Sequence, residues 1–310
     1  MGKILVTGAA GFIGSHLCER FIDEGFEVYG MDNLITGSLE NLENIQSPLF
    51  HFIEHDVTEK GDTETDFDLI LHFACPASPK DYLKYPLETL KANSIGTLKT
   101  LELAESCGAR YMFASTSEVY GDALVHPQSE GYWGNVNPSG PRSVYDEAKR
   151  FSEALSMAYF RKGLDVRIAR IFNTYGPRMK ADDGRVIPNF ISQALNSEPL
   201  TVYGDGYQTR SFCYVDDMVA GIMKMSIMAG LNGEIINLGN PDEYNMLDLA
   251  RIIIEKTDSR SEIIFEALPE DDPHRRCPDI YKARDILGWN PKTILSSGLD
   301  KTINFFKSKI

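Results

Sequence analysis

The stretch KILVTGAAGFIG, residues 3–14, joins a short, continuously apolar segment to a glycine-rich turn. The apolar segment predicts a buried strand, and the spacing in FIGSHLCERFIDEG, residues 12–25, predicts a helix that begins inside the turn. Gly8 allows a tight turn, Gly11 lets the backbone approach a pyrophosphate, and Gly14 allows close packing of helix and strand. Free N–H groups at the start of such a helix attract anions. The stretch therefore predicts a site for a dinucleotide.

The residues that follow favour NAD. The segment FEVYGM, residues 26–31, predicts a second strand, and Asp32 closes it at the distance expected of an acid that binds a ribose. A carboxylate there favours the free 2′-hydroxyl of NAD over the phosphorylated ribose of NADP. The alternative is a glycine-rich turn in an unrelated sheet, with Asp32 as an ordinary loop residue. His55-Asp56-Val57 ends a third predicted strand, where it either borders the adenine or forms a solvated turn.

The first half of the chain alternates between strand and helix patterns. Further apolar runs lie at 49–55, 67–74, 109–115 and 165–172, and long helical patterns at 86–107 and 143–162. Strands without polar alternation that are separated by helices predict a parallel sheet covered on both faces. Right-handed connections then give a doubly wound α/β fold.

The pattern changes after residue 172. Helical patterns near 187–196, 215–228 and 246–257 alternate with short apolar runs and polar loops. We therefore place a soft boundary there. It gives an NAD-binding domain over residues 1–172 and a smaller, mixed α/β lobe over residues 173–310, with some segments of the lobe returning to the first domain.

The composition argues against several classes of function. The chain of 310 residues has a formal net charge of −14, which opposes unaided binding to nucleic acid or anionic lipid. Five scattered cysteines without a Cys-x-x-Cys pair predict reduced thiols in a cytoplasmic protein. The opening apolar run is too short for a signal peptide, and no uncharged apolar stretch reaches the length of a membrane span. We expect no metal site.

Two motifs carry groups suited to proton transfer. The segment STSEVYG, residues 115–121, follows a predicted strand and offers Thr116, Ser117 and Glu118. Tyr145-x-x-x-Lys149 opens an amphipathic helix, which places both side chains on one face. A lysine ammonium there can lower the pKa of the tyrosine, so that a phenolate removes a hydroxyl proton. By itself the pair could equally be a surface tyrosine near an ordinary helix lysine.

In combination, these motifs resemble the extended short-chain dehydrogenase/reductase family of nucleotide-sugar enzymes, which have a Rossmann NAD-binding domain. Within that family, the chain is most similar to the branch that decarboxylates UDP-glucuronate. The similarity covers essentially the whole chain. It is carried by the blocks ASTSEVYGD, HPQSEGYWGNVNPSGPRSVYDEAKR, ARIFNTYGPRM, DGRVIPNFISQAL, EPLTVYGDGYQTRSFCYVDDMV, NLGNP and DDPHRRCPDI.

The resemblance implies roles for individual residues. The implied cofactor-binding residues are Gly8, Gly11, Phe12, Ile13, Gly14, Asp32, Asn33, Asp56, Val57, Ala74, Asn93, Tyr145 and Lys149. The implied catalytic residues are Thr116, Ser117, Glu118, Tyr145, Lys149 and Arg276. The implied substrate-binding residues are Asn173, Arg185, Tyr203, Gln208, Arg210 and Arg276, in a lobe that binds a nucleotide sugar. The resemblance also implies a homodimer through the helices at 86–107 and 143–162.

Ser117 helps to predict which reaction of the family this chain catalyses. Relatives that dehydrate a hexose generally have an aspartate at this position, as the general acid for the leaving 6-hydroxyl. A 6-carboxylate substrate needs no such acid, because oxidation at the 4-hydroxyl makes a β-keto acid that loses carbon dioxide readily. A second acid beside that carboxylate would also add like-charge repulsion. We therefore expect conversion of UDP-glucuronate to UDP-xylose through a 4-keto intermediate, with NAD recycled internally. The alternative is that Ser117 merely fills space in the packing of the protein and has no role in the reaction.

Other functions stay open on the same scaffold. A dTDP-glucose 4,6-dehydratase is disfavoured by Ser117, and a UDP-sugar 4-epimerase by Glu118 and the loop of Arg276. An enzyme that stops at the 4-keto pentose and releases NADH shares the same key residues. A non-catalytic NAD-binding regulator is disfavoured by the intact tyrosine and lysine pair. Cys75 and Cys277 depart from the residues common in relatives, and we interpret both as structural.

Overall fold

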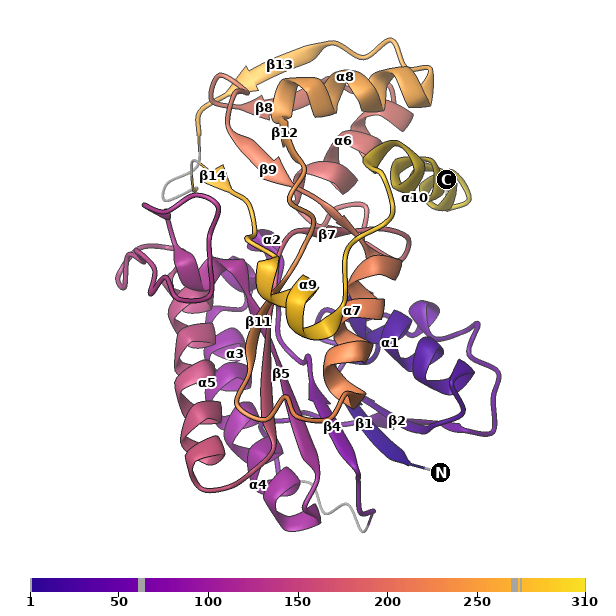
Figure 1. The fold of residues 1–310 in the computed structure, drawn as a ribbon. Coiled ribbons are helices and arrows are strands. Elements are labelled where there is room, and N and C mark those ends of the chain that lie inside the picture. The colour runs from indigo at the N-terminus through magenta and orange to yellow at the C-terminus, as the bar shows by residue number, and fades with distance from the viewer. Residues whose placement is uncertain (1, 61–64, 269–272, 274, 310) are drawn as a thin grey trace.

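The computed structural model describes residues 2–60, 65–268, 273 and 275–309. Within them, one parallel sheet has the strand order β11-β6-β5-β4-β1-β2-β3 (Figure 1). Its strands are β1 (Lys3–Thr7), β2 (Glu27–Asp32), β3 (Phe50–Glu54), β4 (Leu69–His72), β5 (Arg110–Thr116), β6 (Val166–Ile171) and β11 (Ile235–Leu238). The order reverses beside β1, because the chain runs outward to β3 and then returns to β4. Ligands of open α/β sheets bind at such a switch point, at the carboxyl ends of the strands.

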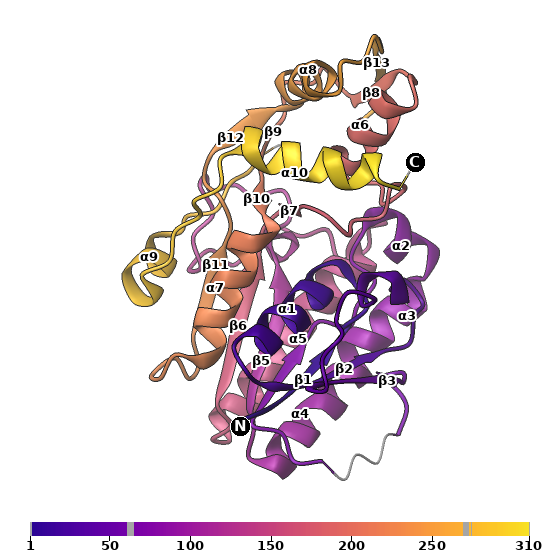
Figure 2. The same ribbon diagram turned by 90° about the vertical axis from the view of Figure 1, so that its right-hand side faces the viewer.

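Helices cover both faces of this sheet (Figures 1 and 2). One face is covered by α1 (Phe12–Asp23) and α7 (Val215–Ile227). The other is covered by α3 (Pro86–Lys91), α4 (Thr97–Cys107) and α5 (Ser143–Arg161). The expected doubly wound α/β fold is confirmed. The single helix expected over 86–107 is interrupted, since a π-helical turn, η2 (Ala92–Gly96), separates α3 from α4.

The remaining elements form a smaller lobe above the carboxyl ends of the strands (Figure 2). Its helices are α6 (Val186–Leu195), α8 (Met246–Thr257) and α10 (Leu295–Lys307), and its strands are β8 (Leu200–Tyr203), β9 (Thr209–Ser211), β12 (Glu243–Asn245), β13 (Ile263–Glu266) and β14 (Arg275–Arg276). The short apolar run at 211–215 is divided between two sheets, because β9 pairs with β12 and β14 whereas β10 (Cys213–Tyr214) pairs with β7 (Thr174–Tyr175). Sequence patterns did not predict α2 (Pro79–Lys84), α9 (Tyr281–Leu287) or α10.

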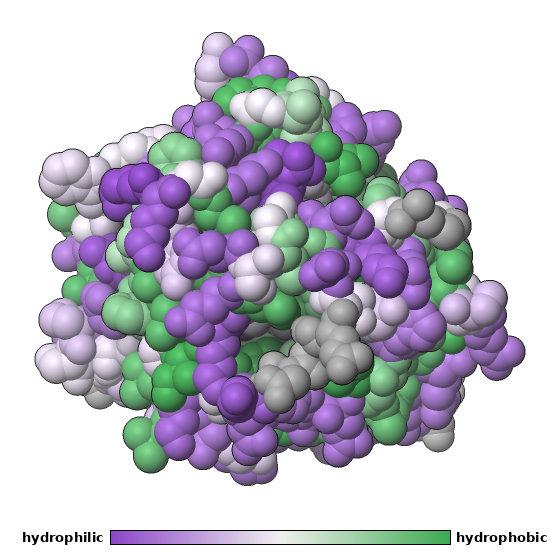
Figure 3. Space-filling model, turned by 90° about the horizontal axis from the view of Figure 1, so that it is seen from below, coloured by the Kyte–Doolittle hydropathy of each residue, from purple (hydrophilic) through white to green (hydrophobic). Residues whose placement is uncertain are grey.

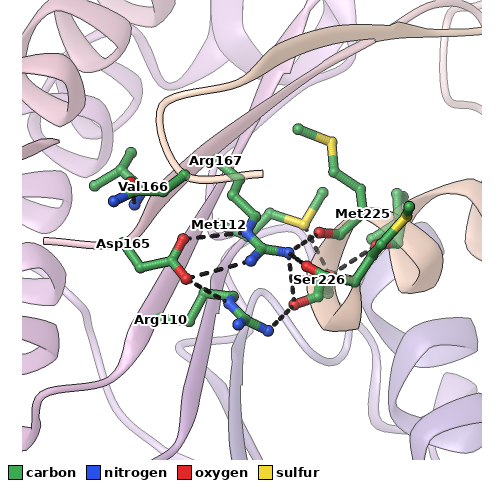
Figure 4. A network of polar contacts seen from close by, with 10 residues as sticks. Arg110, Met112, Asp165, Val166, Arg167, Met225 and Ser226 are labelled. Atoms are coloured by element: carbon green, nitrogen blue, oxygen red, sulfur yellow. Dashed lines mark hydrogen bonds and ion pairs between the residues drawn. The ribbon is translucent and has the colours of Figure 1, made fainter. Parts of the chain in front are cut away.

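A buried arginine fastens the end of α7 to the sheet (Figure 4). The guanidinium of Arg167, in β6, donates to the carbonyl oxygens of Ser226 and Met228 at 3.3 and 2.6 Å. Arg110, in β5, donates to the Ser226 carbonyl at 2.8 Å, and Asp165 accepts hydrogen bonds from both arginines. The last carbonyl groups of a helix lack intrahelical partners and attract cations. The two arginines therefore satisfy them and fix α7 against β5 and β6.

The end of the molecule away from the lobe is seen from below in Figure 3, where hydrophilic and hydrophobic residues intermingle. Among the described residues, none of the helices combines the length and the apolar character needed to cross a membrane. This agrees with the sequence, in which no uncharged apolar stretch reaches that length.

The sheet contains a neutral histidine whose burial makes stability depend on pH. His72 ends β4, is 1% exposed, and its Nδ1 lies 2.8 Å from the Thr7 hydroxyl. Burial lowers the pKa of His72 to about 3. Between that value and its usual pKa near 6.5, the unfolded chain binds a proton that the folded protein does not. The stability that neutral His72 contributes is therefore complete above pH ~6.5 and is lost on acidification.

We predict that His72→Asn changes this dependence. The asparagine keeps an acceptor for Thr7 but does not titrate, so the wild type should lose about 1.4 kcal/mol more unfolding free energy than the variant between pH 8.0 and 5.5. Urea unfolding at both pH values measures this difference. Comparing the two proteins removes the contribution of the other titrating groups. Parallel pH profiles would contradict the assignment.

Candidate active site

A cavity of about 750 Å³ lies at the carboxyl ends of the strands, with residues of both the sheet and the lobe in its wall. The predicted residues that line it are Gly8, Gly11, Phe12, Ile13, Gly14, Thr116, Ser117, Glu118, Tyr145, Lys149, Asn173, Arg185, Tyr203, Gln208, Arg210 and Arg276. Six other predicted residues lie outside this wall, namely Asp32, Asn33, Asp56, Val57, Ala74 and Asn93. Asp271, Asp272 and His274, in the block at 271–280, lie outside the described residues.

The glycine turn has the geometry of a dinucleotide cradle. Gly8 has φ +74°, and a Cβ there would lie 2.7 Å from the backbone of Phe73. A Cβ on Gly14 would collide with the Gly8 carbonyl. Helix α1 has no side-chain cap at its N-terminus, so its first N–H groups can bind an anion. The residues present therefore fit the pyrophosphate of NAD.

The acidic residues beside this turn organise the loops around it. Asp32 accepts hydrogen bonds from the N–H groups of Ala10 and Leu34 at 2.9 and 2.8 Å. Burial raises the pKa of Asp32. Asn33 donates to Asp56 at 2.8 Å, so the ends of β2 and β3 are joined. Asp32 is thus held against the turn, at the edge where we expect the adenosine half of the cofactor.

Tyr145 and Lys149 lie on the inner face of α5. Lys149 donates to the Ala114 carbonyl, at the end of β5, at 2.8 Å, and its Nζ lies 5.8 Å from the centre of the Tyr145 ring. The ring of Tyr82, from α2, stacks on Tyr145 with 5.0 Å between centroids. The helical spacing expected to place both side chains on one face is confirmed.

The expected lowering of the tyrosine pKa is wrong for this structure. Burial raises the pKa of Tyr145, although a hydrogen bond with Thr116 and the charge of Arg185 oppose that effect. Burial also lowers the pKa of Lys149. The lysine is desolvated together with the tyrosine, and its ammonium is directed to a carbonyl group. Arg185, assigned to substrate binding from the sequence, thus acts electrostatically on Tyr145.

The turn after β5 presents a carboxylate that two arginines hold. Residues Ser117–Tyr120 form a single 3₁₀ turn, and the side chain of Thr116 accepts the N–H of Glu118 at 3.3 Å. The Glu118 carboxylate accepts a hydrogen bond from Arg142 at 2.5 Å and another from Arg276. Burial lowers the pKa of Arg276 to about 10. Glu118 therefore connects the main domain to the lobe through Arg276.

A buried ion pair connects β5 and β6 to α5. Arg170, in β6, donates to both carboxylate oxygens of Glu153 at 2.9 and 2.7 Å. Ser115 donates to the same carboxylate at 2.5 Å. Glu153 lies four residues after Lys149 and eight after Tyr145, on the same face of α5. Arg170 also donates to the hydroxyl of Tyr120 at 3.0 Å. The end of β5 and the inner face of α5 therefore have fixed relative positions.

The lobe contributes two arginines side by side. Arg276 in β14 pairs with Arg210 in β9 in parallel register, which places both side chains on one face of this small sheet. Arg210 donates to the Pro273 carbonyl at 2.5 Å, and both guanidinium groups are buried. Gln208 donates to the Tyr203 carbonyl at 2.7 Å. The wall of the cavity thus offers forked donors suited to phosphate or carboxylate oxygens.

Several residues of the wall escaped the sequence analysis. Arg142 stands three residues before Tyr145, within a quoted block, but its partner Glu118 comes from another element. Tyr82 lies in the unpredicted helix α2. The sequence signal for this helix was Ser78-Pro79, an N-cap serine followed by a proline. In the structure, the Ser78 hydroxyl accepts a hydrogen bond from the Asp81 N–H at 3.1 Å.

Cys75 and Cys277 are unactivated, as expected. All five are free thiols. Burial raises the pKa of Cys75, and burial together with Glu243 raises the pKa of Cys277 to about 12. Neither thiol is therefore a nucleophile at neutral pH.

The cavity is basic although the protein is acidic. The basic residues in its described wall are Lys80, Arg142, Lys149, Arg178, Lys180, Arg185, Arg210 and Arg276. The acidic ones are Asp81, Glu118, Asp183 and Glu266. Two of these acids are paired, Glu118 as described and Asp183 with Arg185. The excess of cations favours an anionic ligand over a neutral sugar.

Residues 4–239 match the model of the NAD dependent epimerase/dehydratase family, and the chain belongs to this family. It is 52% identical over 310 residues to UDP-glucuronic acid decarboxylase 4 of Arabidopsis thaliana, a match that covers 99% of this chain and 69% of that protein. It is 55% identical over 300 residues to UDP-glucuronic acid decarboxylase 6 of the same plant, covering 96% and 86%.

Solved structures agree with this assignment. UDP-glucuronic acid 4-epimerase from Bacillus cereus, in complex with UDP-glucuronic acid and NAD, superposes with a TM-score of 0.89. That match has 30% sequence identity and covers 99% of this chain and 100% of the epimerase. The expected membership of an NAD-dependent family of nucleotide-sugar enzymes is confirmed.

We predict that Gly14→Ala weakens NAD binding at least about tenfold, because the added methyl group collides with the Gly8 carbonyl and opens the turn. Isothermal titration calorimetry measures the affinity, and thermal unfolding checks the fold. Gly131→Ala is the matched control, since a Cβ there meets no atom within 4 Å. Equal affinities for NAD in the two variants would contradict the assignment of the glycine turn to NAD binding.

Proposed function

We propose that the protein decarboxylates UDP-glucuronate to UDP-xylose with a bound NAD that is recycled in each turnover. The observation that carries this proposal is the polar turn after β5. It offers the hydroxyls of Thr116 and Ser117, whereas its carboxylate, Glu118, is held by two arginines. Such a turn faces the sugar without a free acid for expelling a hydroxyl group. The curated decarboxylases to which the chain is similar support the same reaction.

The substrate's own carboxylate then provides the leaving group. NAD, when bound, supplies a positively charged ring that accepts a hydrogen with its electron pair from carbon 4 and later returns it. Tyr145 takes the proton of the 4-hydroxyl, and Thr116 and Ser117 are placed to stabilise the oxygen of the resulting ketone. The bond between the ring carbon and the carboxylate breaks, and carbon dioxide leaves. The electron pair of that bond stays on the sugar, where it forms an enolate with the ketone. Protonation at the ring carbon completes the loss, with Glu118 positioning the sugar or a water.

The lobe would bind the nucleotide end. We assign residues 1–172 to NAD and residues 173–310 to the nucleotide sugar, apart from α7 and β11, which pack on the main sheet. Arg210 and Arg276 suit the diphosphate, with Asn173, Tyr203 and Gln208 nearby in the wall. Because Arg276 also contacts Glu118, we assign it to the junction between diphosphate and sugar. Its charge is then available to the carboxylate of the substrate.

We also propose a cytoplasmic homodimer. Apolar side chains are exposed along α2, α3, η2, α4 and the adjoining surface of α5. They are Leu83, Leu87, Leu90, Ile95, Leu98 and Phe151, each at least 38% exposed. The same helices of a second copy would cover these side chains. The cytoplasmic location is proposed because all five cysteines are free thiols, as is usual in that compartment.

The proposed reaction predicts carbon dioxide release from UDP-glucuronate, formation of UDP-xylose, and no lasting NADH absorbance. Tyr145→Phe should reduce carbon dioxide release at least about a hundredfold, because the 4-hydroxyl loses its proton acceptor. Thermal unfolding and NAD titration should stay as in the wild type. Tyr159→Phe, another buried tyrosine of α5, is the control. NADH in amounts equal to enzyme would mean that the ketone escapes, and water loss from a neutral hexose would overturn the proposal.

The role of Ser117 is tested with a charged and a neutral side chain of similar size. Ser117→Asp places a carboxylate beside that of the substrate in a buried position, and repulsion should lower kcat/KM at least about tenfold below that of Ser117→Asn. Carbon dioxide release measures both variants, and NAD titration confirms that each site is intact. Ser117→Asp with wild-type activity would remove this account of the position.

The proposed dimer predicts that Leu87→Asp combined with Phe151→Asp yields a monomer, because two charges would be buried at the contact. Sedimentation velocity measures the mass of the particle. Leu124→Asp alters a still more exposed leucine away from these helices and should leave the dimer unchanged. A wild-type monomer would exclude the assembly.

A further inference from the structure

Three potential metal ligands meet on the far side of the small sheet β12-β9-β14. They are His126, Glu243 and Cys277, and their ligand atoms all lie within 4.8 Å of one another. His126 Nε2 lies 2.9 Å from Glu243 Oε2. His126 and Glu243 are more than a hundred positions apart in the sequence, and a helix and two strands lie between Glu243 and Cys277. The cluster therefore has no spacing motif by which the sequence could predict it.

The backbone around the cluster is fixed by hydrogen bonds of its own. Gln128, two residues after His126, donates its N–H to the Cys277 carbonyl at 2.9 Å, and its side chain accepts the Cys277 N–H at 2.8 Å. Thr209 donates to the other oxygen of Glu243 at 2.6 Å. Partners that orient ligand side chains in this way are typical of metal sites. The cluster is therefore preorganised independently of a cation.

The sheet separates this cluster from the active-site cavity. Successive residues of a strand point to opposite faces. Arg210 and Arg276 line the large cavity, whereas Thr209 and Arg275 line a second cavity of about 560 Å³. His126 and Glu243 line that second cavity too. Cys277 itself is only 3% exposed, so the cluster lies outside the proposed reaction site and opens to solvent through His126 and Glu243.

We propose that His126, Glu243 and Cys277 bind one thiophilic divalent cation of the zinc class, with water as the fourth ligand. A thiolate, an imidazole and a carboxylate form a ligand set that zinc accepts in tetrahedral geometry. Metal–ligand bonds of about 2.0–2.3 Å place such ligand atoms roughly 3.3–3.7 Å apart, within reach of small side-chain movements. The proton of the Cys277 thiol leaves to solvent as the sulfur binds, and neutral His126 coordinates through Nε2.

The bound cation would also fix the loop that contributes Arg276 to the active site. Cys277 follows Arg276 directly, and Arg276 contacts Glu118 on the main domain. A cation that joins Cys277 to His126 and Glu243 links this loop to two other segments at once. The site is therefore a structural clamp behind the substrate-binding arginines.

The test uses the full chain without a polyhistidine tag, titrated with Co²⁺ as a spectroscopic substitute. We expect one equivalent to bind, with a cobalt–thiolate charge-transfer band, the visible bands of tetrahedral cobalt, and loss of both on adding Zn²⁺. Cys277→Ser should abolish the charge-transfer band and weaken binding at least about tenfold. Zn²⁺ should raise the melting temperature of the wild type but not of this variant.

Two further variants keep the outcome clear. Cys107→Ser removes a partly exposed thiol outside the cluster and should preserve both the band and the affinity. Glu243→Gln should weaken cobalt binding while the band remains, since the thiolate is intact. A wild-type spectrum without a thiolate band, or a band that survives in Cys277→Ser, would overturn the site. Because every readout is metal binding, failure here leaves the decarboxylation assay unaffected.

Discussion

The ion pair between Arg170 and Glu153 is the constraint on which the geometry of the site depends. It is buried among β5, β6 and α5, and removing one partner of such a pair typically costs about 3–5 kcal/mol. Through Ser115 it fixes the end of β5, and through the face of α5 it fixes Lys149 and Tyr145. The tyrosine and the hydroxyls after β5 are thereby held in fixed relative positions.

The Bacillus cereus epimerase, solved with UDP-glucuronic acid and NAD, shows that this fold can present the same sugar to a different reaction. Loss of carbon dioxide requires the breaking bond to align with the carbonyl π system. The ion pairs of Glu118 with Arg142 and Arg276 connect the turn after β5 to the lobe, so they fix the surroundings of the proposed reaction.

What the sequence predicted depended on local spacing. The glycine turn, Asp32 and the pair of Tyr145 and Lys149 are each contained within one strand, turn or helix, so periodicity was sufficient to place them. The contact of Glu118 with Arg276 spans 158 positions and follows only from the packing of the lobe. The pKa of Tyr145 was mispredicted for a related reason, because burial is a property of the whole fold. Helix α2, which brings Tyr82 over the tyrosine, is too short for a periodic signal.

The basic cavity inside an acidic protein affects how an anion arrives. A chain with net charge −14 repels a nucleotide sugar at long range, and attraction begins only near the basic residues of the cavity wall. Salt shortens the range of both forces, with a screening length of about 8 Å at physiological ionic strength. Moderate salt would therefore screen the long-range repulsion before it weakens the contacts of the ligand with the buried basic residues. Association should then quicken as ionic strength rises from very low values, the reverse of ordinary electrostatic steering.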